Sequence, residues 1–414
     1  MSRALATSEA AGRPRHLRNP NAASVAERQR VVTEALPRAD HEAARREITS
    51  WPGYAPTPIV SLEGTARAAG VTALLYKDEA HRFALGSFKA LGGAYAVLRV
   101  LQDHLRARGI EATAADLIDG SHLGLVRDVT VACATDGNHG RSVAWGARMF
   151  GCACRIYIHA GVSKDREEAI AAYGATMVRT GGDYDQSVHQ CAHEAAENGW
   201  VLTADTNAGG GSPDVPRMVT MGYTIMVDEM MDQLDRAPTH VFIPAGVGGL
   251  AAAIAGHWAR RAGADAPRMV VVEPHAADCV YRSLATGAPT EVDGNVDSFM
   301  ACLSAGEVSP VAWPILRACV DDVVTIPDEA AAETMRALAE GRHGDAPLVS
   351  GESGCAPVAA LLALANEPEL RAALGLDGRS RVVAIGSEGA TAPEIYERTV
   401  GRSAEAVNAA REAA

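Results

Sequence analysis

The chain has 414 residues, of which 21% are charged, and its formal net charge at pH 7 is −13. This length allows one large or two medium domains, and the negative charge argues against binding to nucleic acid or to an anionic membrane surface. No apolar run approaches the length of a membrane span, and the first 44 residues lack the apolar core of a secretory signal. We therefore expect a cytoplasmic protein whose eight scattered cysteines are reduced, with no metal site.

Lysine is rare in this chain. Only three of the 38 basic residues are lysines, namely Lys77, Lys89 and Lys164. A lysine amine that loses its proton can add to an aldehyde, whereas arginine stays protonated. Lys77 and Lys164 are interpreted as a remnant of the composition bias, and Lys89 as a candidate for chemistry.

The segment GSFKALGGA, residues 86–94, carries Lys89. Apolar residues at helical spacing predict a helix here, with Ser87 as its N-cap. Lys89 would then lie in the first turn, where the helix dipole is expected to lower the pKa of its amine. Gly92 and Gly93 would weaken the helix, which suggests that another element packs closely against it. The alternative is a surface lysine at a helix start.

From about residue 128 onward, short β-branched runs alternate with amphipathic segments. This alternation predicts parallel, doubly wound sheets. There are too many strands for one sheet of usual size, so we expect an α/β protein with two open parallel-sheet lobes and a ligand at their junction or at strand ends. The predicted strands cover residues 129–134, 155–159, 176–180, 201–205, 239–246, 268–274, 321–327 and 380–387.

The segment TDGNHG, residues 135–140, follows the first of these strands and precedes a helix. Asn138 can both donate and accept hydrogen bonds, and Asp136 places a carboxylate at the strand end. The alternative is a capped helix start in which one of these two residues is the cap. His139 is expected to be structural more than catalytic.

The segment FIPAGVGGLAAA, residues 242–253, predicts a strand, a glycine loop and a helix. Backbone N–H groups of such a loop converge on a phosphate. The spacing of Gly246, Gly248 and Ala251, with Glu273 ending the next strand, also fits a dinucleotide site. That alternative leaves Lys89 and the TDGNHG segment unexplained.

Two further glycine-flanked turns contain Glu352 and Ser387, each of which could face a ligand or cap a helix. An aldehyde cofactor with a phosphate requires an amine, a phosphate cradle and polar groups for its ring. The five segments together supply these groups and indicate pyridoxal phosphate.

Over residues 50 to 400, these motifs resemble the fold type II, or tryptophan synthase β-like, pyridoxal-phosphate enzymes. The resemblance implies that Lys89 bonds covalently to the cofactor, Asn138 contacts its ring hydroxyl, and Ser387 lies against the pyridine nitrogen. Glu352 would orient the cofactor or support its pocket, or else be structural. The cofactor-binding residues implied are Phe88, Lys89, Asn138, Gly246, Val247, Gly248, Gly249, Leu250, Glu352 and Ser387.

Within that family, segments such as KDEAHRFALGSFK and VEPHAADCVYRS resemble the diaminopropionate ammonia-lyases. The resemblance implies β-elimination of ammonia from D- or L-2,3-diaminopropionate, which yields pyruvate. Lys89 would take the α-proton of an L-substrate, Asp136 that of a D-substrate, and Asp205 would hold or protonate the β-amine. The residues after Thr206 depart from the family's aromatic and acidic pattern. The substrate-binding residues implied are Ser87, Thr135, Asp136, Gly137, His139, Asp205 and Thr206.

Two other functions stay open. One is a lyase or dehydratase that acts on another β-substituted amino acid, such as a β-hydroxy amino acid. The other is a protein that binds pyridoxal phosphate without turnover. The resemblance also implies a homodimer that binds a small amino acid. The expected division is an N-terminal extension (1–44), a large cofactor-binding domain (45–115 and 206–400), a small domain (116–205) and a C-terminal tail (401–414).

Overall fold

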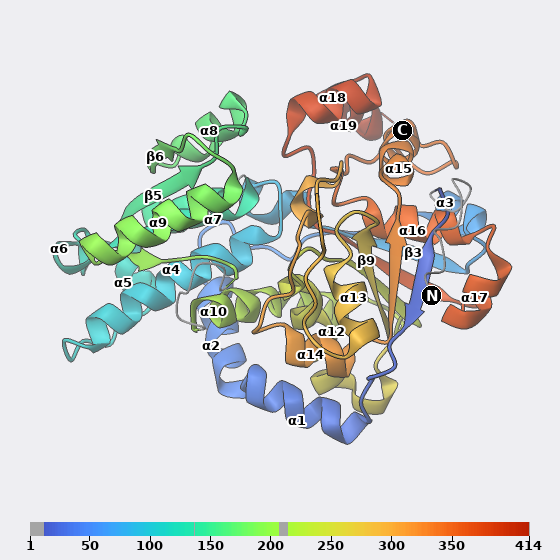
Figure 1. The fold of residues 1–414 in the computed structure, drawn as a ribbon, viewed down its shortest axis with the longest axis horizontal. Helices are drawn as coiled ribbons and strands as arrows, with labels where there is room; N and C mark the ends of the chain where they lie inside the picture. Colours follow the sequence, from blue (N-terminus) through green and yellow to red (C-terminus); the bar gives the residue numbers. More distant parts are fainter. Residues whose placement is uncertain (1–11, 136, 207–213, 414) are drawn as a thin grey trace, which may run out of the picture.

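The computed structural model describes residues 12–135, 137–206 and 214–413. Within these residues the larger sheet has seven strands in the order β1-β10-β9-β8-β11-β3-β2 (Figure 1). The inner strands are parallel, and the edge strands β1 and β2 pair antiparallel with their neighbours. The strands are β1 (Arg15–Arg18), β2 (Ile59–Ser61), β3 (Ala73–Asp78), β8 (His240–Pro244), β9 (Arg268–Pro274), β10 (Asp322–Ile326) and β11 (Arg381–Gly386).

The smaller sheet, in the part of the chain that is described, has four parallel strands in the order β6-β5-β4-β7. The predicted α/β fold with two parallel-sheet lobes is thereby confirmed. The sequence pattern missed β1, β2 and β3, and β7 is shorter than the predicted strand. The strands are β4 (Thr130–Ala134), β5 (Ala153–Ile158), β6 (Thr176–Arg179) and β7 (Val201–Leu202).

Helices cover both faces of the larger sheet, which explains why the inner strands β8 and β10 are buried at every residue. Side chains alternate between the faces, so Met269 and Val271 of β9 join one core, while Val270 and Val272 join the other. The first core contains α1 (Val25–Ala35), α2 (Arg38–Thr49), α10 (Asp214–Tyr223), α11 (Ile225–Gln233), α12 (Gly249–Ala262), α13 (Cys279–Thr286) and α14 (Trp313–Cys319). The second contains α3 (Glu63–Ala68), α15 (Asp328–Glu340), α16 (Ala356–Leu364), α17 (Pro368–Leu374), α18 (Pro393–Val400) and α19 (Ala404–Glu412).

The smaller lobe lies at the left in Figure 1. Helices α7 (Asn138–Phe150), α8 (Lys164–Ala171) and α9 (Tyr184–Asn198) contact its sheet. Helices α4 (Lys89–Arg106) and α5 (Ala114–Ile118) pack against α7, and α6 (Leu123–Val126) packs against α4. Strand β1 falls inside the predicted N-terminal extension and pairs with β10, and α19 falls inside the predicted C-terminal tail. The domain limits themselves stay a prediction. Across the described ranges, none of the helices combines the length and the apolarity needed to cross a bilayer.

Helix α4 begins at Lys89, with Phe88 at the N-cap position, so the predicted Ser87 cap is wrong. Ser87 instead forms an antiparallel backbone bridge with Glu388. The expected close packing at the two glycines is confirmed. A Cβ on Gly92 would lie 2.4 Å from a ring carbon of Tyr223, and one on Gly93 would lie 2.5 Å from the Ser142 hydroxyl.

Four charged side chains are buried beside the segment that connects β3 to α4. The Lys77 amine donates to Glu229 at 2.8 Å, and the Arg82 guanidinium donates to Glu229 at 2.7 Å and to Glu79 at 2.9 Å. All four side chains are at most 3% exposed. Two positive charges therefore balance two negative ones, and Lys77 is a structural residue and not a remnant of composition bias.

Replacing Lys77 with Met would test this network. The variant keeps the length of the side chain but leaves an uncompensated negative charge in the core, so we expect it to lose about 3–5 kcal/mol of unfolding free energy. Urea denaturation followed by circular dichroism would measure the loss. Lys164→Met is the matched control, because the Lys164–Glu168 pair is exposed. Equal stability of both variants would show that the network contributes little.

Candidate active site

A cavity of about 870 Å³ lies between the two lobes. Parallel strands place their carboxyl ends at one edge of a sheet, and residues that follow β4, β8 and β11 meet at this cavity. The predicted site residues that line it are Phe88, Lys89, Thr135, Asn138, His139, Asp205, Thr206, Gly246, Val247, Gly248, Gly249, Leu250 and Ser387.

Other predicted site residues lie elsewhere. Ser87, Gly137 and Glu352 are not among the residues that line the cavity. The N-cap residue of α7 is Gly137 and its first helical residue is Asn138, so the cap that the alternative interpretation placed at Asp136 or Asn138 is wrong. Asp136 lies outside the described residues, as does most of the stretch after Thr206.

Lys89 and Asp205 form an ion pair inside the cavity, with 2.5 Å between Nζ and Oδ2. Burial disfavours the Lys89 ammonium, but the charge and hydrogen bond of Asp205 outweigh it and raise the pKa of Lys89 above its ordinary value. The expected lowering of this pKa is therefore wrong, because a carboxylate in contact is stronger than the dipole of a helix start. Burial likewise opposes ionisation of Asp205, yet the Lys89 charge holds the pKa of that carboxyl well below its usual range.

His139 presents an unpaired ring nitrogen to Asp205. Its Nε2 lies 2.7 Å from the carbonyl oxygen of Thr203, and since a carbonyl only accepts, Nε2 carries the proton. Burial lowers the pKa of His139, so the ring is neutral and Nδ1 holds a lone pair. Among the described residues Nδ1 has no hydrogen-bond partner, and it lies 4.0 Å from Asp205 Oδ2. It is therefore an acceptor available to a bound molecule.

Glu388 is a cavity residue that the sequence interpretation missed. The side-chain amide of Asn138 donates to its Oε2 at 2.5 Å, and the Thr391 hydroxyl donates to the same oxygen at 2.9 Å. Asn138 begins α7 of the smaller lobe, whereas Glu388 follows β11 of the larger sheet, so this contact joins the lobes. Its position directly after Ser387, at a strand end, was the signal that could have found it.

Glu352 was predicted to face the cofactor, but its side chain is buried, with 1% exposed. Its carboxylate has no hydrogen-bond partner within the described part of the chain. Burial, followed by the charge of Glu388, raises the pKa of Glu352 to about 8. The guanidinium of Arg166, on α8 of the smaller lobe, lies 3.7 Å from it. Glu352 is therefore a buried residue that does not line the cavity.

The glycine loop forms the floor of the cavity where α12 begins. Gly248 has a φ of +91°, and a Cβ there would lie 2.5 Å from a methyl carbon of Leu316. A Cβ on Gly246 would lie 3.1 Å from the carbonyl oxygen of Cys302. Side chains are thus excluded at Gly246 and Gly248, which leaves the N–H groups of the helix start free to bind a phosphate.

Glu273 argues against the dinucleotide alternative. Its carboxylate accepts the backbone N–H groups of Val280 and Tyr281, at 2.8 and 2.9 Å, at the start of α13. It is fully buried, and burial raises its pKa to about 8. This carboxyl stabilises a helix start and does not face the glycine loop's cavity.

A buried group outside the cavity, His41, Asp228 and His257, brings potential metal ligand atoms within 4.8 Å of one another. The guanidinium of Arg261 donates to Asp228 at 2.5 Å. Because a cation already neutralises this carboxylate, the group is better described as an ion-pair cluster between helices than as a metal centre.

The cavity fits pyridoxal phosphate. It offers an amine at Lys89, a cradle whose glycines exclude side chains, and polar side chains at Asn138 and Ser387 for a ring. The buried, unpartnered Nδ1 of His139 is a further group that a bound molecule would satisfy.

Several known proteins are similar to this chain over most of its length. A diaminopropionate ammonia-lyase of Salmonella typhimurium is 37% identical over 365 residues, which cover 85% of this chain and 90% of that protein. The crystal structure of the Escherichia coli diaminopropionate ammonia-lyase in complex with D-serine superimposes with a TM-score of 0.85 at 30% identity, covering 96% of this chain and 99% of that one. A threonine deaminase of Solanum lycopersicum shares the fold, with a TM-score of 0.70 at 18% identity and coverage of 94% and 96%.

The family described as "Pyridoxal-phosphate dependent enzyme" matches residues 50–388, which confirms the resemblance found in the sequence motifs. Together with the full-length similarity to the ammonia-lyases, this match makes the cofactor pyridoxal phosphate. The chain belongs to the family of pyridoxal-phosphate dependent enzymes.

Proposed function

We propose that this protein is an ammonia-lyase that cleaves 2,3-diaminopropionate, as the D-isomer, the L-isomer or both, to pyruvate and ammonia. The observation that carries this proposal is the Lys89–Asp205 ion pair inside the cavity, because it combines a reactive amine with a carboxylate that can hold a second amine. The similarity to proteins named diaminopropionate ammonia-lyase supports the same substrate.

The residues that would hold the cofactor lie around the cavity. Lys89 would anchor it covalently, the N–H groups of the Gly246–Leu250 loop would bind its phosphate, and Asn138 and Ser387 would contact its ring. When bound, pyridoxal phosphate withdraws the electron pair that remains on the substrate's α-carbon after a proton leaves.

Proton transfer would then depend on the substrate isomer. The Lys89 Nζ takes the α-proton of an L-substrate, and Asp136, outside the described residues, takes that of a D-substrate. The Asp205 carboxylate, ionised because its pKa lies well below the usual range, accepts N–H groups of the β-ammonium. The β-ammonium leaves as ammonia with the electron pair of the C–N bond, and the released enamine hydrolyses in water to pyruvate and a second ammonia.

A β-hydroxy amino acid is the second candidate substrate. The E. coli relative has been crystallised in complex with D-serine, whose side chain is a β-hydroxyl. A hydroxyl carries no charge for Asp205 to pair with, and we therefore place serine below the diamino acid. We also propose that the protein is cytoplasmic, because its scattered cysteines fit a reducing compartment, and that it is a homodimer, as its family resemblance implies. Light scattering on the purified protein would test the oligomeric state.

Replacing Lys89 with Ala would remove the amine on which the proposal depends. The wild-type protein is expected to show visible absorbance of its covalently held cofactor and to form pyruvate from 2,3-diaminopropionate, and the variant is expected to lose both. An absorbance scan and a coupled lactate dehydrogenase assay would measure these properties. Cofactor absorbance in the wild-type protein without pyruvate from either isomer would support a binding protein or another substrate.

Replacing Asp205 with Asn would remove the charge that faces the β-ammonium. Because hydrogen bonds to charged groups contribute about 1.5–3 kcal/mol, kcat/KM for 2,3-diaminopropionate should fall by roughly 10- to 100-fold, and that for serine by less. Steady-state assays with both substrates would measure the two losses. Asp185→Asn is the control, since Asp185 is exposed at the edge of the same cavity. Equal losses for both substrates would contradict the assigned role of Asp205.

A further inference from the structure

Tyr223 lines the same cavity as Lys89 and has no role in the function described so far. The residue is 2% exposed and lines the cavity. Its hydroxyl is buried and has no hydrogen-bond partner among the described residues. A buried hydroxyl without a partner costs stability, so its presence calls for an explanation in which another group uses it.

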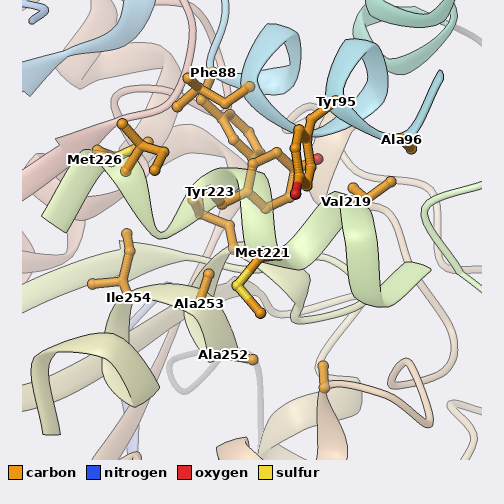
Figure 2. Close-up of a cluster of buried hydrophobic side chains, with 14 of the residues drawn as sticks. Phe88, Tyr95, Ala96, Val219, Met221, Tyr223, Met226, Ala252, Ala253 and Ile254 are labelled. Atoms are coloured by element: carbon orange, nitrogen blue, oxygen red, sulfur yellow. The ribbon is translucent and has the colours of Figure 1, made fainter. Parts of the chain in front are cut away.

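The packing around Tyr223 is built to hold its ring at this place. Its ring meets that of Phe88 edge to face, with 4.7 Å between centroids, and both lie in the apolar cluster between α4, α10 and α12 (Figure 2). On the other side, the absence of a side chain at Gly92 leaves the space that the ring occupies. A glycine inside a helix lowers its stability, so α4 gives up helix propensity to admit this tyrosine beside Lys89.

Lys89 lies among few groups that could fix its orientation. Asp205 contacts its Nζ at 2.5 Å, and the ring of Phe88 lies 5.4 Å from that nitrogen. The Tyr223 ring lies against the same Phe88 ring, with 4.7 Å between centroids, so Tyr223 and the Lys89 amine share one aromatic neighbour. While the amine is paired with Asp205, as in this structure, the Tyr223 hydroxyl makes no hydrogen bond to it. A neutral amine has two N–H donors and one lone pair, so a single acceptor leaves the direction of the lone pair undetermined.

We propose that Tyr223 is a positioning residue for Lys89: its hydroxyl oxygen accepts one N–H of the neutral amine while Asp205 accepts the other, so that the lone pair faces the α-hydrogen of an L-amino acid. This inference rests on the proposed function, in which Lys89 is the base for the L-isomer. In that step the α-C–H bond breaks, its electron pair stays on the α-carbon, and the proton forms the third N–H bond of Lys89.

A phenol suits this position better than a second carboxylate. Burial raises the pKa of Tyr223 above its ordinary value, so the hydroxyl stays neutral. A neutral oxygen accepts an N–H group without adding a negative charge, whereas another carboxylate would favour the ammonium form and keep Lys89 from acting as a base. The pair of one charged and one neutral acceptor thus orients the amine without a second negative charge that would hold its proton more tightly.

The test is Tyr223→Phe in the holoenzyme, which removes one oxygen and retains the ring. We expect kcat for pyruvate formation from L-2,3-diaminopropionate to fall at least tenfold, and turnover of the D-isomer to stay within about twofold, because Asp136 and not Lys89 takes the D-isomer's proton. Cofactor content, measured by absorbance, should equal that of the wild-type protein. The Tm should be equal or higher, because an unpartnered buried hydroxyl is gone.

Tyr95→Phe is the matched control, since Tyr95 is buried in the same cluster and does not line the cavity. It should leave the ratio of L- to D-turnover unchanged. The inference is overturned if Tyr223→Phe reduces both isomers equally, changes neither, lowers the Tm or loses cofactor. If wild-type protein forms no pyruvate, the proposed function fails, and exchange of the α-hydrogen in D2O then tests Tyr223 on the same isomers. No exchange of the L-isomer by the wild-type protein would also overturn the inference.

Discussion

The buried charges of Lys77, Glu79, Arg82 and Glu229 fix the path of the chain between β3 and α4, and the active site depends on that path. Directly after them, Phe83 and Ala84 adopt positive φ values of 49° and 57°, a conformation that costs about 1–3 kcal/mol at each non-glycine residue. Such strain persists only where the surroundings determine the backbone strongly. The network, with two charges of each sign, holds the backbone in this conformation. As a result Lys89, the first residue of α4, lies at the cavity.

Electrostatics in the cavity follow from contacts more than from helix dipoles. Asp205 and Lys89 reinforce each other's charged forms, while His139 remains neutral beside them because burial lowers its pKa. Glu388 binds the side-chain amide of Asn138 and thereby joins the two lobes at the place where the cofactor ring is expected. These groups come from four parts of the chain, so the cavity exists only when both lobes are folded and in contact.

The sequence supplied the fold class and most of the cavity, because strands, glycine loops and helix starts have local patterns. Thirteen of the predicted site residues line the cavity, since the carboxyl ends of parallel strands converge. The sequence pattern did not predict β1 and β2, because these edge strands are short. The predicted Ser87 cap was wrong because the backbone of Ser87 pairs with Glu388. The sequence pattern also missed Glu388 and Tyr223, whose roles depend on neighbours distant along the chain. The lowered pKa expected for Lys89 was wrong for the same reason.

Strand β1 has a practical meaning for anyone who shortens this protein. Residues 15–18 cover the outer side of β10 by antiparallel pairing, and Arg15 also binds Asp278 at 3.0 Å. A truncation that begins at residue 45 would keep every cavity residue and still expose the backbone edge of β10, a strand whose five residues are all buried. An exposed strand edge can pair with another chain and start aggregation, and β1 prevents this by pairing with β10. An affinity tag should therefore be added before residue 15 and should not replace β1.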